Sequence, residues 1–411
     1  MSEVKDISLA PQGEQKIEWA RSHMPVLRSI EEDFKKTRPL AGLKITLSVH
    51  MEAKTAYLCR VMESAGAEMH VTGCNPLSTQ DDVAAAIAAG GIDVHAWRGV
   101  NAEEYERHLI AALRPGPNII IDDGGDLVSL LHTKLIDLLP GVIGGCEETT
   151  TGIHRLHSMA RAGTLRFPMV MVNDAQCKHL FDNRYGTGQS VWDGINNTTN
   201  LLVAGKSVVV SGYGWCGRGV AARAKGLGAR VIITEVDPVR ALEAVMDGHS
   251  VMRMDEAAGV GDVFVTTTGC RDIIRREHFE SMKDGAILSN AGHFNVEIDL
   301  EALSRMAVER FTASANIEGF RLHDGRVLFV LAEGRLVNIA AGNGHPVEIM
   351  DMSFSVQALS AAYIARNRDK LSLGVIAVPE EIDNEVAERK LRAMGFEIDT
   401  LSQAQRVYLD K

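Results

Sequence analysis

The chain has 411 residues, which is long enough for two or three domains and excludes a single small module. Hydrophobic residues make up 45% of it and charged residues 24%, a balance typical of a globular protein and not of a disordered one. The formal net charge is -11 and no stripe of Lys and Arg occurs, so we expect no nucleic-acid partner.

The sequence also gives no sign of membrane association. Residues 83–91 form one of the longest near-apolar runs, far short of the roughly 20 residues that span a bilayer. The polar residues 1–16 lack the apolar region of a signal peptide, so we expect a cytoplasmic protein. The six cysteines are scattered without a C-x-x-C pair, which favours small core residues over disulfides.

The first half of the chain alternates short strand-like runs with helical stretches. Strands are expected at 44–49, 69–72, 118–121 and 168–172, and helices at 54–65 and 81–89. Strands separated by helices predict βαβ units and a buried parallel sheet. A polar stretch with several Gly and Asn, 174–200, then interrupts the alternation.

The alternation restarts after this interruption. Strands are expected at 207–210, 230–234, 262–266 and 286–289, with a helix at 217–227. The polar segment 183–190 and the Gly, Asn and Pro cluster at 342–345 predict two crossings between domains. The charged, helical pattern of 380–411 predicts an arm that packs on a partner subunit.

A glycine-rich motif follows the first strand of the second half. Gly212, Gly214 and Gly217 give G-x-G-x-x-G around Trp215, and Glu235 comes directly after the next strand. The glycines permit a tight turn and the close approach of a pyrophosphate to a helix N-terminus. A carboxylate at position 235 accepts from ribose hydroxyls and repels a 2′-phosphate, so we expect NAD+ as the cofactor.

Two further strand ends belong to the same edge of this sheet. Thr266, Thr267 and Thr268 end one strand, and Asn290 ends the next. Because the carboxyl ends of parallel strands face the ligand crevice, we expect these side chains at the cofactor site. For the threonines, ordinary turn chemistry at a strand end is the alternative.

Polar clusters follow the strands of the first half as well. They contain His50, Glu52, Lys54, Asn75, Asp81, Asp122, Asp123, Asp126, Glu147, Glu148, Thr149, Asn173, Lys178, Asp182 and Asn183. Any one of them alone could be a helix cap or a solvated loop. Their recurrence at consecutive strand ends favours one common site.

With these motifs the chain resembles the S-adenosylhomocysteine hydrolases, the NAD-containing enzymes of the methylation cycle. The resemblance runs from about residue 5 to residue 410. Its motifs are CNPLSTQD at 74–81, DDGGDL at 122–127, EETTTG at 147–152, Lys178 with FDN at 181–183, GHF at 292–294, GRLVN at 334–338 and GHP at 344–346. So many motifs in the family's order exclude chance agreement.

The pattern and the resemblance together predict an α/β fold of two doubly wound, Rossmann-like parallel-sheet domains. The cofactor domain is inserted into a discontinuous substrate domain. The predicted ranges are 1–186 and 345–378 for the substrate domain, 187–344 for the NAD domain and 379–411 for a C-terminal oligomerisation arm. The resemblance also implies a homo-oligomer, a tetramer.

The resemblance implies the reversible hydrolysis of S-adenosyl-L-homocysteine to homocysteine and adenosine. The ribose is oxidised at its 3′ carbon with tightly held NAD+, which makes the 4′ proton acidic. Homocysteine is then eliminated from the 5′ carbon, water adds to the enone, and the ketone is reduced again. No cofactor is consumed.

The implied site residues follow position by position. Lys178 with Asp182 is the implied base at the 3′ hydroxyl, and Asn183 orients this pair. Asp123 and Glu148 match carboxylates that hold the ribose hydroxyls. A buried Lys suits such a role because its pKa moves readily.

A second set of residues serves the other end of the substrate. His50 with Asp123 is the implied proton shuttle for the 4′ carbon and the leaving group. His293 and His345 match residues near the homocysteine end and the closing hinge, and Asn338 matches a contact to the nicotinamide carboxamide. Further expected substrate contacts are Glu52, Lys54, Thr55, Thr149 and Met350. We expect no metal, because the helical pair His154 and His157 has no clear third ligand.

Two segments depart from the family pattern. Typical members read H-M-T-x-E/Q-T, where this chain has Glu52 and Lys54 after His50. Lys54 is only a donor, so it suits the carbonyl of hypoxanthine better than the amino group of adenine, and the alternative substrate is S-inosyl-L-homocysteine. Typical members also end in a Lys- and Tyr-containing tail that reaches the neighbouring subunit's NAD. This chain ends at 408–411 without it, so we expect looser NAD retention.

Two other classes of protein stay open at this point. A plain NAD-dependent dehydrogenase carries the same glycine motif and consumes NAD+ stably. A non-catalytic nucleoside-binding relative would be expected to have lost Lys178, Asp182 or His50, and all three are present.

Overall fold

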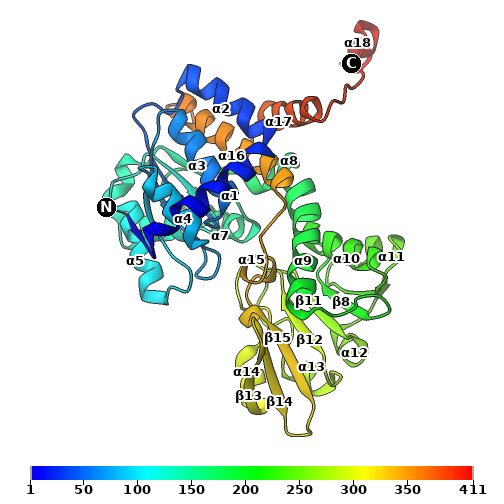
Figure 1. The fold of residues 1–411 in the computed structure, drawn as a ribbon. Helices are drawn as coiled ribbons and strands as arrows, with labels where there is room; N and C mark the ends of the chain where they lie inside the picture. The colour runs from blue at the N-terminus through cyan, green and yellow to red at the C-terminus, as the bar shows by residue number, and fades with distance from the viewer. Residues whose placement is uncertain (1, 410–411) are drawn as a thin grey trace.

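The computed structural model describes residues 2–409 and consists of two lobes, each built on its own eight-stranded sheet (Figure 1). The strands are β1 (Glu3–Val4), β2 (Lys44–Ser48), β3 (Glu68–Thr72), β4 (Asp93–Ala96), β5 (Ile119–Asp122), β6 (Gly144–Glu147), β7 (Pro168–Met171), β8 (Ser207–Ser211), β9 (Arg230–Thr234), β10 (Ser250–Val251), β11 (Val263–Thr266), β12 (Ile287–Asn290), β13 (Ala307–Ser314), β14 (Ile317–Leu322), β15 (Val327–Leu331) and β16 (Gly374–Ala377).

The helices are α1 (Ala10–Ser22), α2 (Pro25–Thr37), α3 (Ala53–Ser64), α4 (Asp81–Ala89), α5 (Ala102–Leu113), α6 (Asp126–Thr133), α7 (Thr150–Arg161), α8 (Gln176–Lys178), α9 (Thr187–Thr199), α10 (Trp215–Gly226), α11 (Pro238–Met246), α12 (Met254–Val260), α13 (Arg276–Ser281), α14 (Leu300–Met306), α15 (Val337–Ala340), α16 (Val347–Asn367), α17 (Glu380–Ala393) and α18 (Gln403–Leu409). A π-helix covers His179–Gly186, and 3₁₀ turns cover Ile7–Leu9, Ile136–Gly141, Val172–Asp174 and Ala332–Gly334.

The first lobe contains a parallel sheet of order β1-β4-β3-β2-β5-β6-β7-β16. α1 to α4 and α16 cover one face and α5 to α7 the other, each over its own cluster of buried apolar side chains. Because both faces are covered, a central strand such as β5 is apolar on both sides.

The second lobe has the strand order β10-β9-β8-β11-β12-β15-β14-β13. The first six strands in this order, β10, β9, β8, β11, β12 and β15, pair in parallel. Helices α9 to α11 cover one face of the sheet, and α12 to α14 cover the other. β13 and β14 extend the sheet in antiparallel fashion. The predicted α/β architecture of two doubly wound sheets is confirmed, and this antiparallel extension is an addition to it.

The predicted strands all lie within one residue of their expected bounds, but other strands were missed. β6 is an instructive case, because its sequence is Gly-Gly-Cys-Glu and carries no strand propensity. A Cβ at Gly145 would lie 2.5 Å from Ile120 Cγ1 and 2.6 Å from Met169 Sδ. The side chains of the neighbouring strands therefore favour glycine at position 145, although glycine has a low propensity for strands.

The polar stretch that interrupts the predicted alternation is helical and forms the first crossing between the lobes. α8, the π-helix and α9 follow one another from residue 176 to 199. Asp383 accepts the N–H groups of Gln176 and Cys177 at 2.6 and 2.7 Å and so caps the start of this segment. The apolar side chains of Val191 and Ile195 pack into the core of the second lobe.

The return crossing leads through α15 and residues 341–346 into α16, a mostly buried helix of the first lobe (Figure 1). After β16, α17 packs on α2 and α16 of the same chain, with Lys390 Nζ 3.0 Å from Asp351 Oδ2. α18 stands away from the lobe. The predicted arm thus divides into one part that packs on its own lobe and one that does not. The predicted domain ranges stay predictions, and their residues 1, 410 and 411 lie outside the described part.

Candidate functional site

A pocket between the two lobes collects most of the predicted substrate residues. They follow strand ends of the first sheet or lie on the two crossings, as expected for a doubly wound sheet. The pocket lining includes His50, Glu52, Thr55, Asp123, Glu148, Thr149, Lys178, Asp182, Asn183, His293, Asn338, His345 and Met350. Lys54 and the glycine motif do not belong to it.

Lys178 is the centre of a buried polar group at the first crossing. Its Nζ donates to Asn183 Oδ1 at 2.7 Å, and Asn183 Nδ2 donates in turn to Asn173 Oδ1 at 3.1 Å. The same Nζ lies 3.5 Å from Asp182 Oδ2 and 3.7 Å from Glu148 Oε1. Lys178 and Asp182 are one helical turn apart, so the backbone of the crossing sets their separation.

The charges in this group shift one another's pKa values. Burial opposes the charge on Lys178, but the carboxylates of Asp182 and Glu148 raise its pKa above the ordinary value. Burial also disfavours ionised Asp182, yet Lys178 and His345 hold its pKa well below the usual range. Burial raises the pKa of Glu148 to about 8. At neutral pH the group therefore contains a charged Lys178, an ionised Asp182 and a mostly protonated Glu148.

His345 links the second crossing to this group. Its Nδ1 lies 2.6 Å from Asp182 Oδ1, and its Nε2 lies 3.3 Å from Thr187 Oγ1 at the start of α9. Ser353 Oγ of α16 donates to the other oxygen of Asp182 at 2.7 Å. The carboxylate of Asp182 thus joins both crossings in one polar network.

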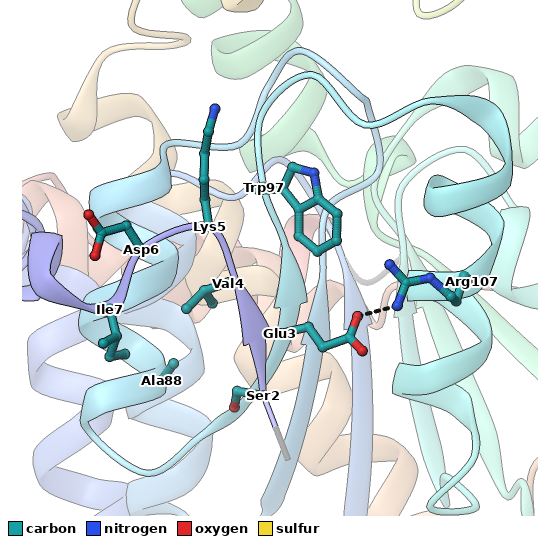
Figure 2. A pocket seen from close by; sticks show the side chains of 9 residues that line it. All are labelled: Ser2, Glu3, Val4, Lys5, Asp6, Ile7, Ala88, Trp97 and Arg107. Carbon is teal, nitrogen blue, oxygen red and sulfur yellow. Dashed lines mark hydrogen bonds and ion pairs between the residues drawn. The ribbon is translucent and has the colours of Figure 1, made fainter.

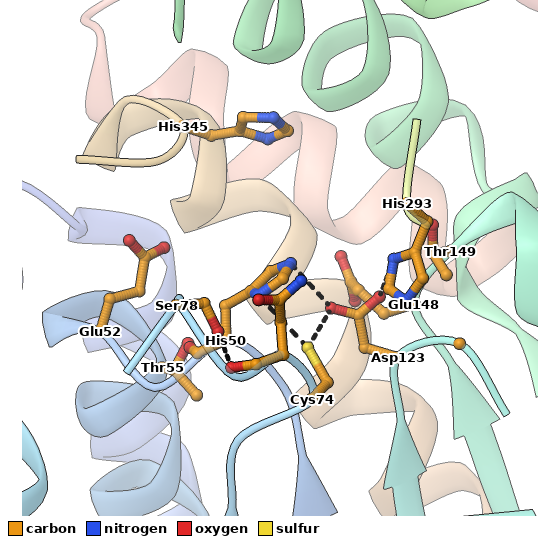
Figure 3. A network of polar contacts seen from close by, with 12 residues as sticks. His50, Glu52, Thr55, Cys74, Ser78, Asp123, Glu148, Thr149, His293 and His345 are labelled. Carbon is orange, nitrogen blue, oxygen red and sulfur yellow. Dashed lines mark hydrogen bonds and ion pairs between the residues drawn. The ribbon is translucent and has the colours of Figure 1, made fainter. Parts of the chain in front are cut away.

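A second polar group lies at the ends of β2, β3 and β5 (Figure 3). Asp123 Oδ2 lies 3.6 Å from His50 Nε2 and accepts from Cys74 Sγ at 3.3 Å. Cys74 Sγ is also 3.3 Å from His50 Nδ1. The other oxygen of Asp123 lies 3.9 Å from His293 Nδ1, which reaches in from the second lobe. Asp123 thus stands between the two imidazoles.

His50 is neutral at physiological pH. Burial lowers its pKa to about 4, even though the Asp123 carboxylate acts in the opposite direction. Burial likewise raises the pKa of the Cys74 thiol, which stays protonated. A neutral imidazole has one nitrogen free to accept a proton, as a general base requires.

The same residues bear on the predicted absence of a metal. Within residues 2–409, His50, Cys74 and Asp123 offer ligand atoms that all lie within 4.8 Å of one another. Here these side chains contact each other through hydrogen bonds and an ion pair. The absence of a metal stays a prediction.

Lys54 lies next to the pocket and not in its lining. Its Nζ donates to the backbone oxygens of Asn343 at 3.0 Å and His345 at 2.8 Å, and it lies 2.9 Å from Glu52 Oε1. Glu52 lines the pocket, and both side chains are buried. Lys54 therefore ties the second crossing to α3, and a ligand meets the Glu52 carboxylate before it meets Lys54.

The glycine motif forms the turn between β8 and α10. Gly212 adopts a φ of +94°, and a Cβ on Gly217 would lie 2.0 Å from the Gly212 carbonyl oxygen, so both positions require glycine. α10 begins at Trp215 after Gly214 without a side-chain cap. Its first N–H groups are therefore available to an anion such as a pyrophosphate.

Glu235 lies beside this turn. One of its oxygens accepts the N–H of Tyr213 at 2.7 Å, and the other accepts the N–H of Val236 at 2.7 Å. The carboxylate is thereby fixed at the end of β9, next to the glycine motif. This is the place where the sequence predicts a partner for ribose hydroxyls.

Two of the predicted cofactor residues are turned into the protein. Thr266 Oγ1 donates to Asn290 Oδ1 at 3.0 Å, and both side chains are fully buried. Asn290 Nδ2 donates to three backbone carbonyls, those of Gly292, Phe294 and Gly334, at 3.1, 2.9 and 2.9 Å. These two residues hold the loops around the cofactor site and do not present their side chains to it.

Thr267 and Thr268 also bond within the protein. Thr267 Oγ1 donates to the Ser211 carbonyl at 2.7 Å. Thr268 donates through its N–H and its hydroxyl to Glu297 Oε2, and Gly269 N–H donates to Glu297 Oε1 at 2.8 Å. Sequence reasoning missed Glu297, because no motif spacing marks it as the anchor of this loop.

Asn338 provides a test of whether the pocket fits a nicotinamide. Its Nδ2 donates to Ser190 Oγ at 3.1 Å, while its buried Oδ1 has no hydrogen-bond partner among residues 2–409. A buried, unpaired oxygen costs about 1–3 kcal/mol, which a donor from a ligand would recover. The carboxamide of NAD+ carries such a donor. Together with the open start of α10, this oxygen shows that the residues fit the cofactor.

Two residues that contact the pocket side chains were not predicted from the sequence. Cys74 belongs to the CNPLSTQD motif, but only the fold brings it against His50. Gln357 of α16 donates to Glu148 Oε2, and α16 is distant from Glu148 in the chain. Both contacts join segments that are far apart in the chain.

The comparisons with known proteins agree with this geometry. The sequence model described as "S-adenosyl-L-homocysteine hydrolase" matches residues 1–139, and that of its NAD-binding domain matches residues 183–344. A protein of Methanococcus maripaludis named "S-inosyl-L-homocysteine hydrolase" is 58% identical over 100% of this chain and 98% of its own length. The chain belongs to the S-adenosyl-L-homocysteine hydrolase family. It is an enzyme, a hydrolase, and its cofactor is NAD+, so these predictions are confirmed.

Other relatives of the hydrolase family carry two different names. The protein of Methanocaldococcus jannaschii, 56% identical over 100% of this chain and 99% of its own length, is an "S-inosyl-L-homocysteine hydrolase". That of Thermococcus kodakarensis, 56% identical over 99% of this chain and 97% of its own length, is an "Adenosylhomocysteinase". Sequence identity alone therefore does not choose between the two purine bases.

The hydrolase also has a hollow of about 900 Å³ beside the edge strand β1, away from this site (Figure 2). Its charged groups already have partners: Glu3 pairs with Arg107 at 2.5 Å, and Arg107 lies 5.7 Å from the centre of the Trp97 ring. Lys5 lies 3.4 Å from Asp81. We place no active site there.

In the part of the hydrolase from residue 2 to residue 409, no helix is both long and apolar enough to cross a membrane.

Proposed function

We propose that this hydrolase cleaves the thioether of a purine nucleoside joined to homocysteine, by oxidation at the 3′ carbon of the ribose and elimination at the 5′ carbon. The observation that carries the proposal is that one pocket holds two separate acid–base groups, one around Lys178 and one around His50. A plain dehydrogenase needs only one of them. The second group supplies what an elimination requires.

The first group suits the 3′ hydroxyl. When bound, NAD+ supplies a hydride acceptor for the 3′ carbon and returns the hydride at the end. The charged Lys178 donates a hydrogen bond to the 3′ oxygen, and the ionised Asp182 accepts the hydroxyl proton, directly or through Lys178. Oε1 of the protonated Glu148 accepts no hydrogen bond within residues 2–409, so it suits a ribose hydroxyl. In this arrangement Lys178 is the hydrogen-bond donor, and Asp182 is the base of the pair.

The second group suits the 4′ carbon and the sulfur. The neutral His50 accepts the 4′ proton, and the electron pair left behind expels the thiolate from the 5′ carbon. Asp123 lies between His50 and His293, so it stabilises whichever imidazole is protonated. His50 with Asp123 can later deprotonate the water that adds to the enone.

We also propose that the purine base is hypoxanthine. Hypoxanthine presents an N1–H donor and a carbonyl acceptor, whereas adenine presents an N1 acceptor and an amino donor. Glu52 in the pocket lining accepts from N1–H, and Lys54, whose Nζ lies 2.9 Å from Glu52 Oε1, holds that carboxylate in place. Adenine would present its N1 acceptor to the Glu52 carboxylate, which is itself an acceptor. The relatives from Methanococcus maripaludis and Methanocaldococcus jannaschii are named as inosyl enzymes, which supports this base. The relative from Thermococcus kodakarensis is named as an adenosyl enzyme, which supports the alternative.

Incubation with S-inosyl- and S-adenosyl-homocysteine tests both proposals. We expect free homocysteine without net formation of NADH, and a kcat/KM at least about tenfold higher for the inosyl compound. The double variant Glu52→Thr and Lys54→Gln should reverse this preference and keep cleavage. Net NADH without homocysteine would make the protein a plain dehydrogenase. Equal or better use of the adenosyl compound would contradict only the choice of base.

We further propose that the enzyme is a cytoplasmic homotetramer, with the substrate and NAD domains divided as predicted. Support for the assembly comes from residues 394–409, where the apolar side chains of Phe396, Ile398 and Tyr408 are exposed. Support for a reducing compartment comes from six cysteines that are all free thiols. Light scattering at several concentrations tests the assembly, and a monomer at micromolar concentration would contradict it.

A further inference from the structure

Asp383 is a buried carboxylate to which the proposed reaction assigns no task. It belongs to α17 and is not among the residues that line the active-site pocket. Its Oδ2 accepts the N–H of Gln176 at 2.6 Å, and its Oδ1 accepts the N–H of Cys177 at 2.7 Å. The Cys177 thiol also donates to the Asp383 carbonyl, at 3.3 Å. One residue of α17 thus fixes two successive peptide groups of the first crossing.

These two peptide groups directly precede Lys178. α8 consists of Gln176, Cys177 and Lys178, and Ala175 before it provides no side-chain cap. The N–H of Lys178 donates to the Ala175 carbonyl at 3.0 Å, so the turn is tight. Asp383, which lies 207 positions from Gln176 in the chain, therefore caps the turn from which the Lys178 side chain extends.

The segment after Lys178 has an unusual backbone. A π-helix covers His179–Gly186, and hydrogen bonds in such a helix join residues five positions apart. In an α-helix of 3.6 residues per turn, side chains five positions apart point about 140° away from each other. The 2.7 Å bond from Lys178 Nζ to Asn183 Oδ1 spans five positions, so it depends on the wider turn. The start of this turn is the part that Asp383 holds.

α17 is itself firmly held in the first lobe. Ile382 and Val386, one position before and three positions after Asp383, are buried in its core. Further along the helix, Lys390 Nζ lies 3.0 Å from Asp351 Oδ2 of α16. α17 packs against both α8 and α16 (Figure 1). A functional side chain supported by rigid elements keeps its geometry more precisely than one on a free loop.

We infer that Asp383 is a positioning residue of this enzyme. It sets the backbone from which Lys178 extends, and so holds the Lys178 ammonium in place between Asp182, Asn183 and the 3′ oxygen of the ribose. The inference rests on the proposed function, because it depends on the proposed role of Lys178. It adds that a helix near the end of the chain, outside the pocket, determines the rate of the oxidation step.

Two substitutions at this position test the inference. Asp383→Ala removes both acceptors, and Asp383→Asn keeps one. The holoenzyme is mixed rapidly with an excess of inosine or adenosine, whichever the wild type uses faster, and reduced nicotinamide reports oxidation at the 3′ carbon alone. We expect its rate to fall on the order of 100-fold in Asp383→Ala, as for a displacement of about 1 Å at reacting groups. In Asp383→Asn the fall should be about tenfold, because one acceptor remains.

A second readout separates positioning from binding and from general stability. The KM for the nucleoside should stay within about threefold of the wild type in both variants, because Asp383 does not line the pocket. Arg389→Gln is the matched control, since Arg389 also belongs to α17 but bonds to Asp33 of α2, at 2.8 Å. It should lower the unfolding temperature, as the Asp383 variants do, and keep the rate of nicotinamide reduction within about twofold of the wild type.

A folded Asp383→Ala enzyme that reduces its nicotinamide at the wild-type rate would overturn the inference. An equal loss of rate in Arg389→Gln would overturn it too, because the effect would then follow from the stability of α17 in general. Asp383→Asn decides between these results if Asp383→Ala does not fold. A wild type that forms no reduced nicotinamide with either nucleoside would instead contradict the proposed function.

Discussion

At the carboxyl edge of the first sheet, polar side chains point into the pocket and keep unused hydrogen-bonding capacity. Glu148 Oε1 is buried and accepts no hydrogen bond from residues 2–409. At the same edge of the second sheet, Thr266 and Asn290 bond to each other and to backbone carbonyls. There it is the bare turn at Gly212 and the open start of α10 that face the ligand.

This difference separates two ways of building a site. In the first lobe, side chains held by the fold carry the chemistry, so single substitutions there should remove activity. In the second lobe, side chains hold the loops and backbone groups are left open for the cofactor, so single substitutions should lower stability first. Buried polar groups without partners cost stability and are kept where a ligand completes them. Asn338 and His293 are exceptions, because the second lobe presents both side chains directly to the pocket.

The largest expected effect is in the first lobe. Lys178→Gln removes the cation that contacts Asp182 and Asn183 and that we propose as the donor to the 3′ oxygen. We expect turnover to fall by at least about 1,000-fold. Release of homocysteine and the redox state of the bound nicotinamide measure the loss.

Lys134→Gln is the control for this substitution, because Lys134 is exposed and pairs with Glu106 at the surface. It should keep wild-type activity. If Lys178→Gln retained more than about a tenth of the activity while folding normally, the first lobe would not carry the chemistry as described.

A smaller effect, on stability, is expected in the second lobe. Asn290→Leu keeps the volume but removes the amide group that donates to three backbone carbonyls, two of these bonds being buried and one part-buried. Buried acceptors left unpaired cost about 1–3 kcal/mol each, so the free energy of unfolding should fall by about 3 kcal/mol. Denaturant unfolding of the holoenzyme measures it. Asn197→Ala, at an exposed position of α9, should have no effect. Equal stability of both variants would mean that the second lobe does not depend on these bonds.

The smallest effect concerns the dependence on pH. Because the pKa of Glu148 is raised to about 8, its neutral form is present below that pH and is lost as the pH rises through it. Ionised Glu148 adds a negative charge next to Asp182, so kcat/KM should decline above about pH 8. In Glu148→Gln this alkaline decline should disappear, whatever the absolute rate. A decline of unchanged position would assign it to another group.

Much of the fold follows from local sequence. Runs such as Val208-Val209-Val210 predict buried parallel strands, and the glycine motif with Glu235 predicts the dinucleotide turn. β6 and the helical first crossing do not follow in this way. The side chains of the neighbouring strands leave no room for a Cβ at position 145, and residues 176–199 are helical where the chain crosses between the lobes. Such requirements come from tertiary packing, which local propensity does not contain.

The site shows the same division. Their positions at strand ends and in the family motifs predict His50, Asp123 and Lys178 as site residues. The structure gathers these three residues in one pocket. They do not reveal that Asn290 is turned inward or that Lys54 bonds to the second crossing. Which polar group finds a partner inside the protein is decided by contacts between segments far apart in the chain.

The central claim is that two groups in one pocket divide the reaction, Lys178 at the 3′ carbon and His50 at the 4′ carbon and the sulfur. Rapid mixing of His50→Gln holoenzyme with the thioether substrate tests it most directly. We predict that reduced nicotinamide accumulates while homocysteine release slows by at least about 100-fold. Homocysteine release at the wild-type rate, or no reduced nicotinamide at all, would contradict the account.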